Sequence, residues 1–262
     1  MIPNLIVRLD ANFLGGAGKR AYRGYLQRRA IRALEDSLEY RFIVHYKKDN
    51  LNLLSELCDK YGSDKGEIKQ SGHPYPWPSQ TFADFYSRLF DHCRLGIKKV
   101  FECGLGTNNP NLVSSMGVTG MPGASLRVWK DYFPHAQVYG ADIDRDILFK
   151  EDRITTFFID QTDPRTIAEF WGAVGCDDFD LMVDDGLHTF EAGVCLFEHS
   201  ISKLSKDGIY IIEDIGIANL SKYQHYFAQK DYKVEFVNLL RPYFWLDDNS
   251  LVVIRKNSIT TS

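Results

Sequence analysis

Two apolar runs in this chain each end in a pair of acidic residues. The run 179–183 is followed by Asp184 and Asp185, and the run 208–212 is followed by Glu213 and Asp214. A short apolar run bounded by turn-forming residues is typical of a buried parallel strand, and the carboxyl ends of such strands face the ligand crevice of an open α/β sheet. If the two strands are neighbours, four carboxylates and the nearby His188 share one small volume. We therefore expect a cation or a cationic substrate between them.

A glycine turn follows an earlier expected strand. Glu102 ends that strand and is followed by Gly104 and Gly106, which permit a tight turn and close approach of the backbone to a ligand. A dinucleotide-binding turn would have a third glycine where this chain has Asn109. An acid at Glu102 suits a cationic amino group and would repel a pyrophosphate. A simple glycine turn without a ligand is the alternative for this segment alone.

The next two expected strands also end in acids. Asp142 is placed to accept hydrogen bonds from ribose hydroxyls, and Asp160, followed by Gln161, could meet the exocyclic amine of an adenine. Each aspartate alone is more often a helix cap or a turn former. Acids at three successive strand ends are much less readily explained by chance. The series Glu102, Asp142 and Asp160 therefore favours a positively charged ligand that contains a nucleoside.

These side chains need a sheet to bring them together, and the chain alternates strand and helix patterns from residue 98 onward. We expect strands near 98–102, 137–141, 155–159, 179–183 and 208–212, and helices near 125–132, 164–172, 190–204 and 219–229. Two late strands, near 233–237 and 251–254, have no helix between them and predict an antiparallel hairpin at the sheet edge. The predicted fold is α/β, with a doubly wound, mostly parallel seven-stranded sheet that ends in this hairpin.

Two segments precede this core, which we assign to 98–262. Residues 1–50 form a predicted helical extension with ten Lys and Arg against four Asp and Glu up to residue 48, and residues 51–97 form a helical segment that lines the site. A docked or oligomer-forming helix with solvated arginines is our preferred interpretation of the extension, and a helix that binds a membrane surface or an acidic partner is the alternative. We expect a homo-oligomer.

The bulk composition excludes several functional classes. The chain has 262 residues, 44% of them hydrophobic, with a net charge of −4 and a pI near 6.0, so no general attraction to nucleic acid or anionic membranes is expected. Its five cysteines show no paired spacing and indicate reduced thiols. No apolar run approaches the roughly 20 residues of a membrane span, and the first residues lack a signal-peptide pattern. We expect a cytoplasmic protein without a membrane span.

The motifs together resemble a known family. The segments 101–106 and 140–142, with Asp160, resemble the S-adenosylmethionine site of class I methyltransferases, which have a Rossmann-like sheet. The acid pairs with His188 resemble the metal-dependent branch of O-methyltransferases that act on macrolide sugars in the mycinamicin and tylosin pathways. The segment 61–66 resembles an element upstream of the core in relatives of that branch. The resemblance covers residues 50–256.

This resemblance implies a role for each motif. It gives Mg²⁺, or another divalent cation, the ligands Asp185, Glu213 and Asp214, with His188 as general base. The cofactor S-adenosylmethionine would be bound by Glu102, Gly104, Gly106, Asp142, Asp160, Gln161 and Asp184. Substrate contacts are assigned to Tyr61, Asp64, Lys65, Tyr75 and Trp77. Asp184 is assigned to the cofactor or to a loop rather than to the metal. The sequence departs from the family at Leu187, where a small polar residue is common, and in a long insertion at 107–124, which is either a lid or a plain surface loop.

The leading hypothesis is therefore an S-adenosylmethionine- and Mg²⁺-dependent O-methyltransferase. Its substrate would be a hydroxyl of a sugar in a glycan precursor or a natural-product glycoside. The alternatives are an N- or RNA methyltransferase with the same cofactor, and a cofactor-binding scaffold without catalysis. In a purely structural interpretation, the paired acids cap the helices that follow them and His188 is an ordinary hydrogen-bonded histidine.

Overall fold

The computed structural model describes residues 52–68, 74–75, 77–240 and 248–257, together with the single positions 22, 25, 28, 29, 32 and 44. The basic extension predicted for residues 1–50 lies almost entirely outside the described residues. In the part of the chain that the structure describes, no helix is both long and apolar enough to cross a membrane.

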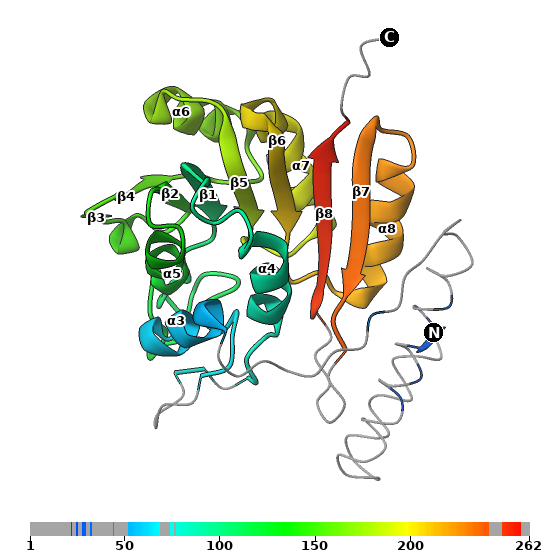
Figure 1. Ribbon diagram of the computed structural model, residues 1–262, viewed down its shortest axis with the longest axis horizontal. Coiled ribbons are helices and arrows are strands. Elements are labelled where there is room, and N and C mark those ends of the chain that lie inside the picture. Colours follow the sequence, from blue (N-terminus) through cyan, green and yellow to red (C-terminus); the bar gives the residue numbers. More distant parts are fainter. Residues whose placement is uncertain are drawn as a thin grey trace.

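The centre of the molecule is an eight-stranded sheet with the strand order β3-β4-β2-β1-β5-β6-β8-β7 (Figure 1). Strands β1, β2, β4, β5 and β6 run parallel, whereas β3, β7 and β8 each pair antiparallel with a neighbour. The bounds are β1 Lys99–Cys103, β2 Gln137–Asp142, β3 Lys150–Glu151, β4 Ile154–Phe158, β5 Phe179–Asp184, β6 Leu204–Ile212, β7 Tyr232–Asn238 and β8 Ser250–Lys256.

This sheet confirms the predicted fold class and its terminal hairpin, with one difference in the strand count. The eighth strand is β3, whose two exposed residues pair with β4 and form one edge of the sheet. Two exposed polar residues carry no hydrophobic periodicity, so no sequence pattern marks such a strand. Strand β6 begins at Leu204 rather than near the expected residue 208. The preceding helix ends at Ser200, and a short 3-10 turn, η2 (Ile201–Lys203), leads directly into the strand.

Helices cover both faces of the sheet (Figure 1). Alternate residues of β5 belong to different hydrophobic clusters, Leu181 and Val183 to one and Met182 to the other, because successive strand side chains point to opposite faces. The first cluster includes side chains of α3, α4 and α5, and the second includes side chains of α6, α7 and α8. The bounds are α3 Leu53–Tyr61, α4 Phe82–Phe90, α5 Ala124–Tyr132, α6 Pro164–Val174, α7 Phe190–Ser200 and α8 Ile217–Phe227, with a 3-10 turn, η1, at Arg145–Ile147.

The helix starts show which residues serve as caps. The side chain of Thr189 accepts a hydrogen bond from the backbone of Ala192 and caps α7, so neither acid of the pair at 184–185 has that role. Helix α8 begins after Gly216 and has no side-chain cap. The acidic pairs at the ends of β5 and β6 are therefore not helix caps, which leaves their carboxylates available for another role.

Candidate active site

The three central strands bring the acids together. Strand β5 lies between β1 and β6, with Asp184 in register with Cys103 on one side and with Ile212 on the other. The residues that follow or end these strands therefore meet at one edge of the sheet, as expected for the carboxyl ends of parallel strands. The two strands that are followed by acid pairs, β5 and β6, are therefore neighbours, as the sequence led us to expect.

A cavity of about 370 Å³ opens at this edge. One end is walled by the glycine turn and the ends of β2 and β4, and the other by the loops after β5 and β6. The predicted residues that line it are Asp64, Lys65, Tyr75, Trp77, Gly104, Gly106, Asp142, Asp160, Gln161, Asp185, His188 and Asp214. The predicted residues outside its lining are Tyr61, Glu102, Asp184 and Glu213.

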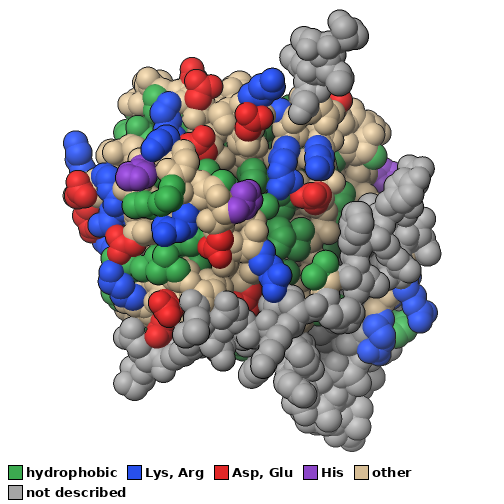
Figure 2. All heavy atoms as spheres, in the orientation of Figure 1, with side chains coloured by type: hydrophobic (Ala, Val, Ile, Leu, Met, Phe, Trp, Pro, Cys, Tyr) green, Lys and Arg blue, Asp and Glu red, His purple; other side chains and the backbone are tan. Residues whose placement is uncertain are grey.

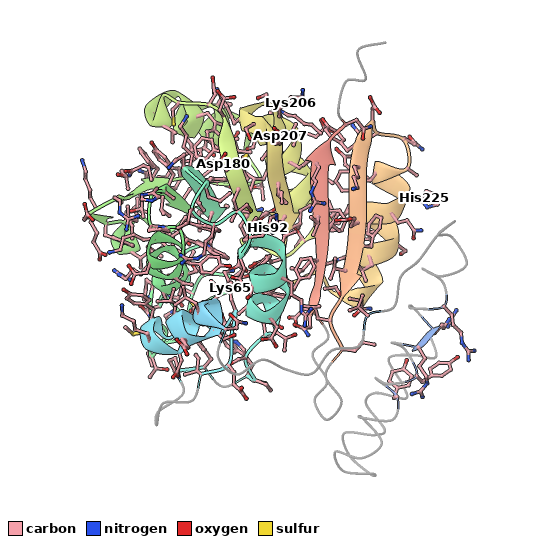
Figure 3. All side chains as sticks on the ribbon, viewed as in Figure 1. Lys65, His92, Asp180, Lys206, Asp207 and His225 are labelled. Atoms are coloured by element: carbon pink, nitrogen blue, oxygen red, sulfur yellow. The ribbon has the colours of Figure 1, made fainter. Side chains whose placement is uncertain are left out.

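A lysine lies at the centre of the converging carboxylates. Lys65 is 4% exposed, and its ammonium nitrogen is 2.6 Å from Oδ2 of Asp185 and 3.3 Å from Oε1 of Glu102, and it also donates to Glu213 (Lys65 is labelled in Figure 3). Burial lowers the pKa of Lys65, but the three carboxylate charges outweigh it and raise that pKa well above its usual value. The protein thus supplies part of the positive charge that the acid cluster requires.

The two glutamates lie beneath the cavity floor. Glu102 is completely buried and accepts a hydrogen bond from the indole of Trp129, and Glu213 accepts one from the hydroxyl of Tyr86. Burial raises the pKa of Glu213 to about 8, although Lys65 opposes this shift. Glu102, predicted to contact the cofactor, faces Lys65 instead of the cavity. Glu213, predicted to bind a metal, is held by Lys65 and Tyr86.

A second group of acids faces the cavity itself. Nε2 of His188 lies 3.3 Å from Oδ1 of Asp185 and 3.7 Å from Oδ2 of Asp214. One ligand atom from each of the three residues lies within 4.8 Å of the others, a spacing that could hold a metal ion. The two carboxylates open toward the cavity and fit a divalent cation, with the remaining coordination positions left for water or substrate, and the ring nitrogen of His188 lies beside them.

The surroundings of His188 keep its imidazole protonated in this arrangement. Burial lowers its pKa, but the hydrogen bond with Asp185 and the charge of Asp214 raise it to about 10. The backbone of His188 has φ +57° and that of Asp214 has φ +50°, in the left-handed region that non-glycine residues rarely adopt. Such conformations are enriched at functional sites, and here they occur at two of the three residues of the group, although Arg153 and Asp178 outside the site adopt them as well.

Asp184 holds the loop that carries this group. Its Oδ1 accepts hydrogen bonds from Nε2 of Gln161 at 3.0 Å and from the backbone of Gly186 at 3.3 Å. Oε1 of Gln161 accepts in turn from the backbone of Leu187 at 2.5 Å. Gln161, which lies just beyond β4, is thereby connected to the loop between Asp185 and His188. The two ends of the cavity therefore share one hydrogen-bond network.

The nucleoside end of the cavity is shaped by backbone hydrogen bonds. Oδ2 of Asp142 accepts from the backbone of Leu105 in the glycine turn at 2.7 Å, and Asp160 accepts from the backbone of Thr162 at 2.9 Å. Both aspartates are therefore turn formers, as their residue type alone suggests, and both also line the cavity. Their positions at adjacent strand ends match the predicted series.

Gly104 is the position of this turn that another residue would disrupt most. Its φ is +94°, and a Cβ there would overlap the backbone carbonyl of Asp185. We expect Gly104→Ala to destabilise the fold by more than about 1–2 kcal/mol and to abolish cofactor binding, since the clash is with backbone. Thermal unfolding with and without S-adenosylmethionine measures both effects.

The matched control is Gly172→Ala in α6, where a Cβ meets nothing within 4 Å and alanine should be neutral or stabilising by about 0.5–1 kcal/mol. Equal melting temperatures for the two variants would contradict this assignment.

The segment upstream of β1 supplies the remaining wall. The rings of Tyr75 and Trp77 stack with centroids 5.2 Å apart, and the indole of Trp77 donates to Asp64 at 2.9 Å. Tyr61 lies elsewhere. Its hydroxyl donates to Asp131 of α5 at 2.6 Å, because α3 ends at Tyr61 and packs along α5. Its assignment as a substrate contact is not supported by this position.

Three features of the site go beyond what the sequence predicted. Gln80 donates to Asp214 at 3.0 Å and to Asp248 at 3.3 Å, and each of these acids lies more than a hundred positions after Gln80 in the chain. The insertion 107–124 contributes Met116, which packs against Gly106, and other cavity-lining side chains. The central position of Lys65 could not be inferred either, since nothing near it in the sequence indicates burial among carboxylates.

Comparisons with known proteins agree with this geometry. No protein-family model matches the chain. It is 33% identical over 167 residues to demethylmacrocin O-methyltransferase of Streptomyces fradiae, which covers 63% of this chain and 37% of that protein. It is 30% identical over 162 residues to 8-demethyl-8-alpha-L-rhamnosyl tetracenomycin-C 2'-O-methyltransferase of Streptomyces olivaceus, which covers 62% of this chain and 37% of that protein. These similarities confirm the resemblance to sugar O-methyltransferases, and the chain spans just over a third of the length of these relatives.

Solved structures show the same fold. The MycE methyltransferase of the mycinamycin biosynthetic pathway, in complex with Mg and SAH, superposes with a TM-score of 0.53 and 22% identity over 80% of this chain and 55% of that chain. A further complex of that enzyme, with Mg, SAH and mycinamycin VI, gives a TM-score of 0.53 and 23% identity over 78% of this chain and 54% of that chain. The sheet and its helices are therefore those of a methyltransferase fold.

Proposed function

We propose that the protein is an S-adenosylmethionine-dependent and divalent-cation-dependent O-methyltransferase that acts on a hydroxyl of a sugar. One observation carries the proposal: a single cavity joins the glycine turn and the acids Asp142 and Asp160 at one end to the group Asp185, His188 and Asp214 at the other. The first end suits a nucleoside with a positive charge, and the second suits a metal-assisted deprotonation. The names of the similar proteins, which are sugar O-methyltransferases, support the same activity.

The cofactor end of the cavity fits S-adenosylmethionine. Asp142 and Asp160 would accept hydrogen bonds from the ribose hydroxyls and the adenine amine, and the open backbone at Gly104 and Gly106 leaves room for the methionine portion. When bound, this cofactor supplies a sulfonium methyl group as the electrophile. Asp185 and Asp214 add negative charge to the same cavity, which favours a positively charged ligand over a dinucleotide.

The metal end fits a divalent cation held by Asp185 and Asp214, with Glu213 as the further ligand that the resemblance implies. When bound, such a cation lowers the pKa of a coordinated hydroxyl and fixes its orientation. His188 is the group of this chain that takes the hydroxyl proton, since its ring nitrogen lies at the cavity-facing acids. His188 would act as the base once the charges of Asp185 and Asp214, which hold its proton in the metal-free protein, were taken up by the cation.

A sugar hydroxyl of a glycoside is the proposed acceptor. Tyr75 and Trp77 both line the cavity and stack on each other, and Trp77, the less buried of the two, is the aromatic side chain that would pack against the apolar side of a sugar ring. Val113 and Met121 of the insertion are exposed and line the same cavity, so an apolar portion of the acceptor has a surface to contact.

Mass spectrometry of a substrate panel tests this function. The full chain is incubated with S-adenosylmethionine and Mg²⁺ in the presence of nucleotide sugars and natural-product glycosides, and each reaction is searched for a mass increase of one methylene. We expect the increase on the sugar of at least one glycoside and none when His188→Ala replaces the wild-type protein. Methylation confined to amines or to RNA would contradict the proposal.

The surface charge argues against RNA as the substrate. On the face shown in Figure 2, basic and acidic side chains of the described residues are interspersed, and basic side chains do not gather into a stripe there. The net charge of the chain is −4. Binding of a phosphate backbone requires clustered positive charge and is strongly salt-dependent.

A further inference from the structure

Lys65 contacts two carboxylates that the proposed function gives to the divalent cation. Its ammonium lies 2.6 Å from Oδ2 of Asp185 and donates to Glu213 as well. An ammonium and a divalent cation held by the same pair of carboxylates repel each other, even where they contact different oxygens. The two cations therefore compete for Asp185 and Glu213.

An acceptor for the displaced ammonium is already present. Oε1 of Glu102 is buried, has no hydrogen-bond partner among the described residues and lies 3.3 Å from the ammonium nitrogen of Lys65. The ion pair with Lys65 is what balances this buried oxygen, since a buried carboxylate oxygen left unpaired is costly. Oε2 of Glu102 accepts from the indole of Trp129, so Oε1 stays directed at Lys65.

The backbone of Lys65 is fixed while its side chain has a choice of partners. Its carbonyl accepts a hydrogen bond from the backbone of Ala83 at 2.8 Å, and the preceding carbonyl, of Asp64, accepts one from Gln80 at 2.7 Å. Both bonds attach the segment to the start of α4. The flexible four-carbon stem can then move the ammonium between carboxylates without any change of the main chain.

We propose that Lys65 is a placeholder for the metal: its ammonium neutralises Asp185 and Glu213 in the metal-free protein, and it moves away from them onto Oε1 of Glu102 when a divalent cation binds. This inference rests on the metal site of the proposed function. It assigns to Glu102 the role of a charged acceptor for Lys65, which explains why this acid of β1 faces Lys65 rather than the cavity.

Substitutions at Lys65 and at Glu102, whose side chains contact each other, should change the metal affinity in opposite directions. In Lys65→Met the competing ammonium is absent, so Mn²⁺ should bind at least about tenfold more tightly and raise the melting temperature more than in the wild-type protein. In Glu102→Gln the displaced ammonium has no charged acceptor, so Mn²⁺ should bind about tenfold more weakly. The matched control is Lys60→Met, which removes an exposed lysine that pairs with Asp131 at 2.9 Å and should leave the affinity unchanged.

Electron paramagnetic resonance of free Mn²⁺ in titrations of the full-length variants gives the dissociation constants without any methyl acceptor. Tighter binding by Lys65→Met together with weaker binding by Glu102→Gln supports the placeholder. Equal or weaker binding by Lys65→Met overturns it, and so does wild-type affinity in Glu102→Gln. If Lys65→Met does not fold, the Glu102→Gln result decides. If the wild-type protein and Lys65→Met both bind no Mn²⁺, the placeholder and the metal site fail together, while cofactor binding is tested independently by calorimetry.

Discussion

Replacement of His188 by alanine should lower the turnover number for methyl transfer by about 10²–10⁴-fold, the usual effect of removing a positioned general base. His188 is the residue of the cavity-facing group to which the proposed mechanism gives the proton of the acceptor hydroxyl. The substitution removes no cavity-lining residue of the cofactor end. The dissociation constant for S-adenosylmethionine should therefore remain within a few-fold of the wild-type value.

The control for this variant is His225→Ala. His225 is exposed on α8, away from the cavity, and is labelled in Figure 3. Its replacement should leave both turnover and cofactor binding unchanged. Rates for the two variants under saturating cofactor give the comparison directly. A His188→Ala protein that retains wild-type turnover would mean that another group removes the proton, and the assignment of the base would be wrong.

Removal of divalent cations should abolish turnover, and added Mg²⁺ should restore it. The reason is that a sugar hydroxyl is a poor nucleophile until a cation lowers its pKa. Asp214→Asn leaves the shape of the site nearly unchanged but removes one of its two cavity-facing carboxylate charges. It should raise the Mg²⁺ concentration needed for half-maximal activity by about 10–100-fold.

Asp207→Asn provides the matched control for this substitution. Asp207 is exposed, lies on the same strand β6 near its opposite end and is labelled in Figure 3. Its Mg²⁺ requirement should equal that of the wild-type protein. Activity that persists after exhaustive chelation, in the wild-type protein and in Asp214→Asn, would exclude a catalytic role for the metal.

The sequence was sufficient for the sheet because buried strands are marked by local patterns. The apolar runs that became β5 and β6 are bounded by turn residues, and their acids follow at the point where the strands end. Neighbouring strands then placed Asp185 and Asp214 in one cavity, as predicted. The helix start at Thr189 decided between a capping role and a site role for the acids, and only the structure could show it.

The assignments that the structure changed depend on contacts between distant segments. Lys65 reaches Glu213 across 148 positions of the chain, and no local pattern predicts which of several lysines becomes buried. The packing of α3 directs Tyr61 to α5. The segment that follows α3 places Lys65 beside Glu102. Two adjacent acids, Glu213 and Asp214, face different partners, and the backbone at Asp214 has a left-handed conformation. Such directions are set by tertiary packing rather than by residue type.

Isothermal titration calorimetry of S-adenosylmethionine into the full chain tests the central claim most directly, since it requires no knowledge of the acceptor. We predict saturable binding at a single site, with binding lost in Gly104→Ala and retained in His188→Ala. The absence of any binding heat from the wild-type protein at millimolar cofactor would contradict the assignment of this cavity to methyl transfer.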